Sequence, residues 1–214
     1  MYLQDEKPLD EIYNEIEGEW YLPEDEEGSL SGDKFDYVVT PGNEKIVFIK
    51  AGAGGSARGY GDKYVKMADR IHERIGATVI CASNPIDPIC DSCDEIEIRS
   101  VVSELGLDDF ELYLLGASDG AYLNLELAGK FPETVKWVGI NTSFFEIEEL
   151  EAEIKALANV EKIMVVGTKD EDFDKLAPAL GKIASDNFSV KFVEGADHHF
   201  TDMLDEFIAL SELV

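Results

Sequence analysis

Six short apolar runs alternate along most of the chain with segments whose apolar residues recur at helical spacing. The runs are KIVFIKA (45–51), ATVICA (77–82), ELYLLG (111–116), VKWVGIN (135–141), EKIMVVG (161–167) and FSVKFVE (188–194). A run that is apolar at nearly every position is typical of a parallel strand covered on both faces. Helices are expected between the strands, over 62–76, 91–106, 121–130, 147–159, 172–185 and 202–213. The sequence therefore predicts an α/β fold, with a mostly parallel, doubly wound sheet and helices on both faces.

Residues 1–34 form an acidic N-terminal extension ahead of the first of these runs. GEWYL (18–22) and KFDYVVT (34–40) alternate apolar and polar residues on either side of the turn-rich PEDEEGSLSGD, which predicts an antiparallel hairpin. For residues 1–16 there are two alternatives, a short amphipathic helix or a loose end. No linker or internal repeat follows, so residues 1–214 are predicted to form a single domain.

The charge of the chain limits its partners. It carries 46 acidic and 18 basic residues, which gives a formal net charge of −28. Such a field repels phosphate backbones and anionic lipid head groups, so neither nucleic acid nor a membrane surface is expected as a partner. We interpret the charge as a solvated, solubilising surface. The sequence shows neither a basic-then-apolar leader nor a membrane-spanning run, which predicts a cytoplasmic protein. Whether the protein forms a homo-oligomer is left open by the sequence.

Three cysteines, Cys81, Cys90 and Cys93, fall within CASNPIDPICDSC. A Cys-x-x-Cys pair can bind zinc or form a redox disulfide, but zinc needs further ligands, and neither a second pair nor a nearby His-x-x-x-His supplies them. A small, odd number of cysteines in a cytosolic chain usually means reduced thiols. No metal and no cofactor is therefore expected.

The segment LLGASDGAYLNLELAGK (114–130) places Gly116, Ser118 and Gly120 where a buried strand gives way to a helix. This spacing is the G-x-S-x-G pattern of a nucleophile elbow, a tight strand-to-helix turn that exposes a serine, and the alternative is an ordinary strand-to-helix turn. Chemistry in parallel sheets gathers at the carboxyl ends of the strands. Acidic residues follow the fifth run, and a histidine follows the sixth, so the chain order is serine, acid, histidine.

From about Phe35 onward the chain resembles the α/β-hydrolase family, in particular its small esterase-like members without a lid domain. The motifs that carry the resemblance are AGAGGS (51–56), LLGASDGA (114–121), VVGTKDEDF (165–173) and EGADHHF (194–200). The resemblance implies a catalytic triad of Ser118 as nucleophile, Asp170 as acid and His198 as base. Asp172 is the alternative acid, whereas His199 and the helical His72 are not expected to serve as the base.

The resemblance also implies an oxyanion hole made of two backbone N–H groups, those of Asp119 and Ala53. Many members of the family carry His-Gly at the start of the loop after the first parallel strand. This chain has Lys50-Ala51-Gly52 there. The amide survives that change, but a hydrogen bond that supports the loop is expected to be lost.

The segment between the fourth and fifth runs holds one helix and its loops, which predicts a lidless and open site. Phe144 and Phe145 follow the fourth run, where they line a substrate pocket or pack against the next helix. The function implied is a carboxylesterase-like serine hydrolase that cleaves a small ester or thioester through an acyl-enzyme. The alternatives are an amidase or short-peptide hydrolase, and a non-catalytic binding protein of the same fold.

Overall fold

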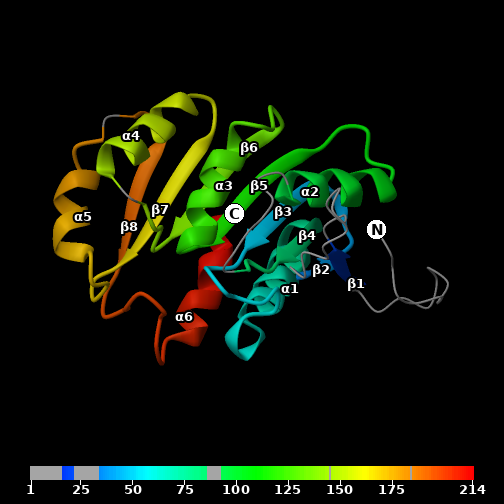
Figure 1. Ribbon diagram of the computed structural model, residues 1–214, viewed down its shortest axis with the longest axis horizontal. Coiled ribbons are helices and arrows are strands. Elements are labelled where there is room, and N and C mark those ends of the chain that lie inside the picture. The colour runs from blue at the N-terminus through cyan, green and yellow to red at the C-terminus, as the bar shows by residue number, and fades with distance from the viewer. Residues whose placement is uncertain (1–15, 22–33, 86–92, 145, 184) are drawn as a thin grey trace, which may run out of the picture.

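The computed structural model describes residues 16–21, 34–85, 93–144, 146–183 and 185–214, and it contains an eight-stranded sheet (Figure 1). The order of the strands is β1-β2-β4-β3-β5-β6-β7-β8. β1 pairs antiparallel with β2, and β2 pairs antiparallel with β4, whereas all the other neighbours are parallel. The predicted mostly parallel α/β sheet is confirmed.

The strands are β1 (Ile16–Tyr21), β2 (Lys34–Thr40), β3 (Asn43–Lys50), β4 (Ala77–Ala82), β5 (Glu111–Ala117), β6 (Thr134–Ile140), β7 (Glu161–Gly167) and β8 (Phe188–Val193). The helices are α1 (Lys63–Ile75), α2 (Cys93–Glu104), α3 (Asp119–Ala128), α4 (Ile147–Ala156), α5 (Phe173–Leu180) and α6 (Leu204–Ala209). Among the described residues there are also two 3₁₀ turns, η2 (Tyr60–Asp62) and η3 (Leu210–Leu213). The segment 202–213, predicted as one helix, is therefore a short α-helix that tightens into a 3₁₀ turn. Helices commonly end in this way.

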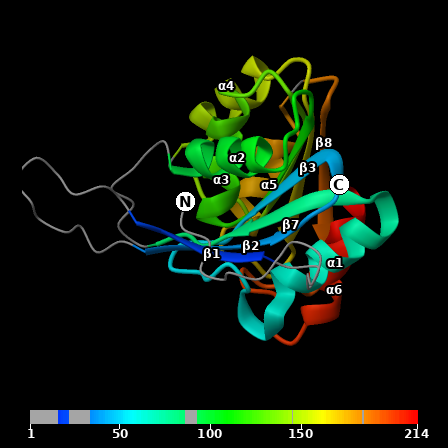
Figure 2. The ribbon, with the colours of Figure 1, turned by 90° about the vertical axis from the view of Figure 1, so that its right-hand side faces the viewer.

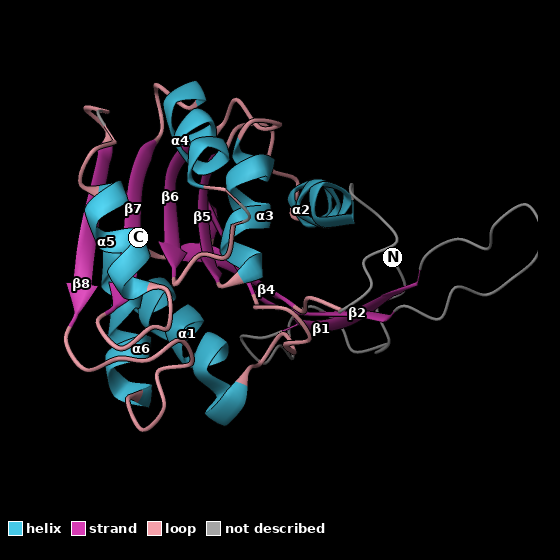
Figure 3. Cartoon of the chain, turned by 60° about the vertical axis from the view of Figure 1, so that its left-hand side comes forward, coloured by secondary structure: helices cyan, strands magenta, loops and turns pink. Residues whose placement is uncertain are grey.

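Two hydrophobic clusters lie on opposite faces of the sheet, because successive side chains of a strand point to opposite sides. Ile46 and Phe48 of β3 join the cluster beneath α2, α3, α4 and α5. Val47 and Ile49, which alternate with them, join the cluster beneath α1 and α6. Figures 2 and 3 show the two groups of helices on either side of the sheet. Every residue of β4 is buried, as expected for a strand covered on both faces.

The N-terminal hairpin is confirmed as the pairing of β1 with β2, in which Ile16 lies opposite Val39 and Tyr21 opposite Lys34. Residues 1–15, for which a helix or a loose end was expected, lie outside the described residues. Between β6 and β7, residues 141–160 contain α4, and residue 145 is not described. Within the described part of the chain, every helix is too short or too polar to span a bilayer.

A buried ionic cluster lies at the carboxyl end of β3. The Lys50 side chain is 2% exposed, and its Nζ lies 2.5 Å from Asp94 Oδ1 of α2. Glu97, one turn further along α2, is buried, and no described residue hydrogen-bonds its Oε1. Burial raises the pKa of Glu97 well above its ordinary value, Asp94 raises it further, and Lys50 opposes the shift. Glu97 is therefore protonated in the folded protein under conditions in which it ionises in the unfolded chain.

This difference predicts how the stability responds to pH. Above the ordinary pKa of about 4.5, the folded state holds a proton on Glu97 that the unfolded chain releases, so this group lowers stability as the pH rises. Glu97→Gln removes the effect. The Tm of the variant, relative to wild type, should therefore be higher at pH 8 than at pH 4, by about 2–4 °C for each kcal/mol that Glu97 costs. Thermal unfolding at both pH values measures the difference.

The control is Glu95→Gln, which removes a carboxylate from the same helix at the surface, where it pairs with Arg99. A Tm difference between Glu97→Gln and wild type that stays constant from pH 4 to pH 8 would contradict the assignment.

Candidate active site

Ser118 forms the turn between β5 and α3, with φ 53° and ψ −126°. A positive φ is strained for a residue with a Cβ, so the surrounding structure has to hold this conformation. Ser118 N–H donates to Ile140 O of β6 at 2.8 Å, and Ser118 O accepts from Ser143 N–H at 3.2 Å. Both main-chain polar groups of Ser118 are therefore hydrogen-bonded to the segment at the end of β6.

The small residues around Ser118 allow three backbones to approach one another. A Cβ on Gly116 would lie 2.5 Å from Ala121 Cα of α3, and one on Gly120 would lie 2.1 Å from Ala51 O. A Cβ on Gly52 would lie 3.2 Å from Ser118 Cβ. Strand β5, helix α3 and the loop after β3 thus meet at the serine. This close approach accounts for the glycines of the G-x-S-x-G pattern.

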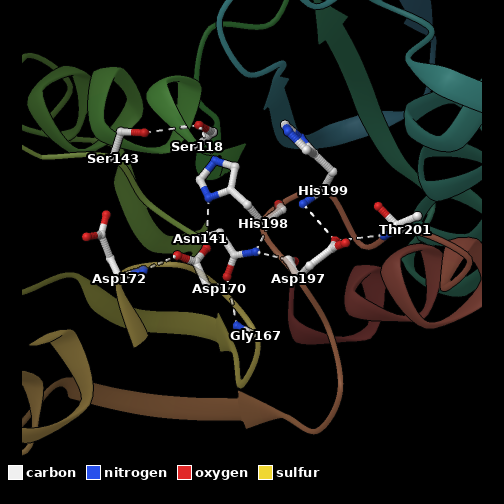
Figure 4. A network of polar contacts seen from close by, with 10 residues as sticks. All are labelled: Ser118, Asn141, Ser143, Gly167, Asp170, Asp172, Asp197, His198, His199 and Thr201. Carbon is white, nitrogen blue, oxygen red and sulfur yellow. Dashed lines mark hydrogen bonds and ion pairs between the residues drawn. The ribbon is translucent and has the colours of Figure 1, made fainter. Parts of the chain in front are cut away.

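Ser118, His198 and Asp170 form a hydrogen-bonded chain (Figure 4). Ser118 Oγ lies 2.9 Å from His198 Nε2, and His198 Nδ1 lies 2.8 Å from Asp170 Oδ2. A carboxylate only accepts hydrogen bonds, so Nδ1–H donates to Asp170, and Nε2 accepts the Ser118 hydroxyl when the ring carries no second proton. The Asp170 side chain is 4% exposed and the His198 side chain 30%. The structure thus brings the three predicted residues together in one hydrogen-bonded chain.

The alternative acid, Asp172, has a different place. Its N–H donates to Asp170 Oδ1 at 3.0 Å, and its own carboxylate points away from Asp170 (Figure 4). Asp170 N–H in turn donates to Gly167 O at 3.1 Å. Asp172 therefore holds the second oxygen of Asp170 through its main chain.

The loop after β8 carries both adjacent histidines. Asp197 Oδ1 accepts from Thr201 N–H at 2.8 Å and from His199 N–H at 3.1 Å. Hydrogen bonds from Thr201 lower the pKa of Asp197, and the bond from the His199 main chain lowers it further. The His199 ring packs edge to face against the His198 ring, with centroids 5.2 Å apart. His72 lies in α1, where its Nδ1 is 2.9 Å from Ala77 O.

Asn141, the residue after β6, joins the two loops that carry the acid and the histidine. Its Nδ2 donates to the carbonyls of Asp197 and His198 at 3.1 and 3.0 Å, and its Oδ1 accepts from Gly167 N–H at 2.8 Å. Asn141 is 3% exposed and has φ 45°, a region that asparagine tolerates better than most residues. One buried amide thus fixes the spacing between the loops after β7 and β8 (Figure 4).

The predicted oxyanion loop is held by Asn84, which follows β4. Asn84 O accepts from Gly54 N–H at 2.6 Å, and Asn84 N–H donates to Gly55 O at 2.9 Å. Its side-chain Nδ2 donates to Asp119 Oδ2 at 3.0 Å. Among the described residues, no acceptor contacts the N–H of Ala53. Asn84 therefore contacts both segments that the predicted oxyanion hole uses, and it braces a loop that lacks the His-Gly pair.

The predicted pocket phenylalanines and the cysteines are described only in part. Phe144 is half-buried and packs against the cluster beneath α2, α3, α4 and α5, as the packing alternative describes, and Phe145 lies outside the described residues. Cys81 is buried, and its thiol donates to Tyr64 O at 3.5 Å, while Cys90 and the side chain of Cys93 lie outside the described residues.

Sequence reasoning missed Asn84, Asn141 and Ser143, whose Oγ lies 3.0 Å from Ser118 Oγ. The signal that could have indicated them is their position just beyond the carboxyl ends of β4 and β6, where a parallel sheet gathers polar groups.

Several solved structures have a similar fold, and each similarity covers nearly the whole of this chain. Est1E from Butyrivibrio proteoclasticus has a TM-score of 0.63 at 13% identity, covering 92% of this chain and 96% of its own. The esterase domain of a Rhodothermus marinus protein has a TM-score of 0.61 at 15% identity, with coverage of 94% and 96%. Dienelactone hydrolase from Anabaena variabilis has a TM-score of 0.57 at 18% identity, with coverage of 92% and 96%.

These similarities identify the fold as the α/β-hydrolase fold, as the sequence motifs imply. No protein-family profile and no curated protein matches the sequence.

The close approach at Gly120 predicts a large effect of one methyl group. Gly120→Ala forces its Cβ against Ala51 O, so the backbone has to shift, at a cost of about 1–3 kcal/mol. We expect the Tm to fall by about 2–4 °C for each kcal/mol. The matched control is Gly181→Ala, where the new Cβ would lie 3.6 Å from the nearest atom and φ is −65°. Equal Tm values for the two variants would show that the elbow tolerates a side chain.

Proposed function

We propose that this protein is a serine hydrolase that cleaves a small ester or thioester through a covalent acyl-enzyme. The observation that carries the proposal is the bonded chain from Ser118 Oγ through the His198 ring to the buried Asp170 carboxylate. A serine that donates to an oriented imidazole is the arrangement that activates a hydroxyl for acyl transfer. The proposal is supported by structural neighbours whose names include esterases and a dienelactone hydrolase.

The first half of the reaction forms the acyl-enzyme. Ser118 Oγ attacks the carbonyl carbon of the substrate while its proton moves to His198 Nε2. The carbonyl electron pair moves onto the oxygen, which the N–H groups of Ala53 and Asp119 stabilise. The tetrahedral intermediate collapses, the bond to the leaving alkoxide or thiolate breaks, and Nε2 returns the proton to the leaving group.

The second half releases the acid. A water molecule gives a proton to Nε2 and forms a bond to the acyl carbon, and the C–Oγ bond then breaks as Nε2 returns that proton to Ser118. Asp170 holds the ring in the tautomer that accepts a proton at Nε2, and it stabilises the imidazolium that forms in each half. The starting hydroxyl and imidazole are regenerated.

Removal of the nucleophile tests the proposal. Wild-type protein should react covalently with a fluorophosphonate probe and hydrolyse 4-nitrophenyl acetate, whereas Ser118→Ala should do neither at more than about a thousandth of the wild-type rate. The Tm should stay close to wild type, because alanine loses only one hydroxyl. A wild-type protein that is inert to both reagents would favour a non-catalytic binding protein, and a Ser118→Ala variant that keeps turnover within about tenfold would exclude Ser118 as nucleophile.

The two aspartates give a matched pair for the acid. Asp170→Asn replaces the acceptor of His198 Nδ1–H, so the ring can adopt the wrong tautomer and kcat should fall by about 10⁴. Asp172→Asn keeps the hydrogen bond from its main-chain N–H to Asp170 Oδ1, so kcat should stay within about threefold of wild type. Steady-state kinetics on 4-nitrophenyl acetate measures both variants. The reverse order of severity would move the acid to Asp172.

A further inference from the structure

Ser143 places a second hydroxyl against the nucleophile. Its Oγ lies 3.0 Å from Ser118 Oγ, and its N–H donates to Ser118 O at 3.2 Å. The side chain is half-buried, and it approaches Ser118 from a different side than the His198 ring does (Figure 4). The main-chain bond between the same two residues keeps the Ser143 hydroxyl at this position.

A count of hydrogens gives the direction of the Oγ–Oγ hydrogen bond in the state in which His198 can accept a proton. His198 Nδ1–H donates to Asp170, so Nε2 of the neutral ring has a lone pair and no hydrogen. The single hydrogen of the Ser118 hydroxyl therefore points to Nε2. Ser118 Oγ is left with lone pairs for its other partner, and the hydrogen between the two serines belongs to Ser143.

We propose that Ser143 is a further catalytic residue, whose hydroxyl donates a hydrogen bond to Ser118 Oγ throughout the reaction cycle. The inference rests on the proposed function. When the Ser118 proton moves to Nε2, negative charge gathers on Oγ, and the Ser143 O–H dipole stabilises it. The same charge returns when the C–Oγ bond of the acyl-enzyme breaks and the electron pair moves onto Oγ. Ser143 keeps its own proton in both steps.

A purely structural role for Ser143 predicts a different result. The main-chain bond from Ser143 N–H to Ser118 O does not need the side chain, so Ser143→Ala leaves the turn braced and removes only the hydroxyl. The neighbouring Thr142 offers a matched control. It is 3% exposed, and no described residue hydrogen-bonds its Oγ1. Thr142→Val thus removes a buried hydroxyl from the same segment without touching Ser118.

The experiment compares wild type, Ser143→Ala and Thr142→Val in the hydrolysis of 4-nitrophenyl acetate and in the rate of fluorophosphonate labelling. A hydrogen bond to a charged group contributes more than one between neutral groups, so Ser143→Ala should lower kcat about tenfold. The labelling rate should fall by a similar factor, because phosphonylation also passes through charge on Oγ. KM should stay within about twofold, because the bond is made to the enzyme's own nucleophile. Thr142→Val should keep kcat within about twofold.

The outcomes separate this inference from the function on which it rests. If the wild-type protein neither reacts with the fluorophosphonate nor hydrolyses 4-nitrophenyl acetate, the proposed function itself is wrong. Active wild type with an equally active Ser143→Ala would overturn the role of Ser143 and leave the triad intact. A loss in Thr142→Val as large as that in Ser143→Ala would also overturn it, because packing of the segment would then explain both. Ser143→Gly removes the same hydroxyl and takes the place of the alanine variant if the latter does not fold.

Discussion

The site depends on the close packing of main chains around Ser118. The loop after β3 passes so near to Gly120 that an added Cβ would lie 2.1 Å from Ala51 O, and β5 meets the first turn of α3 at Gly116. Van der Waals contact of this kind fixes atoms more tightly than a flexible side chain can. The strained φ of Ser118 is therefore held by its neighbours, and the serine, the predicted oxyanion loop and the start of α3 form one rigid unit.

Two buried asparagines connect the loops around the site to this framework. Asn141 binds the loops after β7 and β8, and Asn84 binds the loop after β3 and the Asp119 carboxylate. Both residues follow strands that lie in the interior of the sheet, so their hydrogen bonds attach the loops to the sheet. Positioning within a fraction of an ångström matters for catalysis, and such hydrogen bonds contribute to it together with the buried loop residues Ala196 and Phe200.

The fold and the turn at Ser118 could be predicted because their signals are local, whereas Asp170 and His198 were predicted only from motifs of the family that the chain resembles. Apolar runs indicate buried strands, and glycines at alternate positions around a serine indicate a turn that brings backbones together. Asn84, Asn141 and Ser143 carry no such signal, since their partners are 25 to 57 residues away and only the strand order brings them close. The raised pKa of Glu97 was likewise hidden, because a Glu on an acidic helix gives no indication that it is buried.

The position of His198 has a consequence for synthesis of the protein on the ribosome. Ser118 follows a central strand, but its partner histidine follows β8, which lies at the edge of the sheet and is translated after all the other strands. A nascent chain that has folded through β7 holds the serine, its turn and Asp170 without a base to take the serine's proton. Under the proposed function, any reactivity that Ser118 owes to His198 thus appears only once the loop after the last strand is in place.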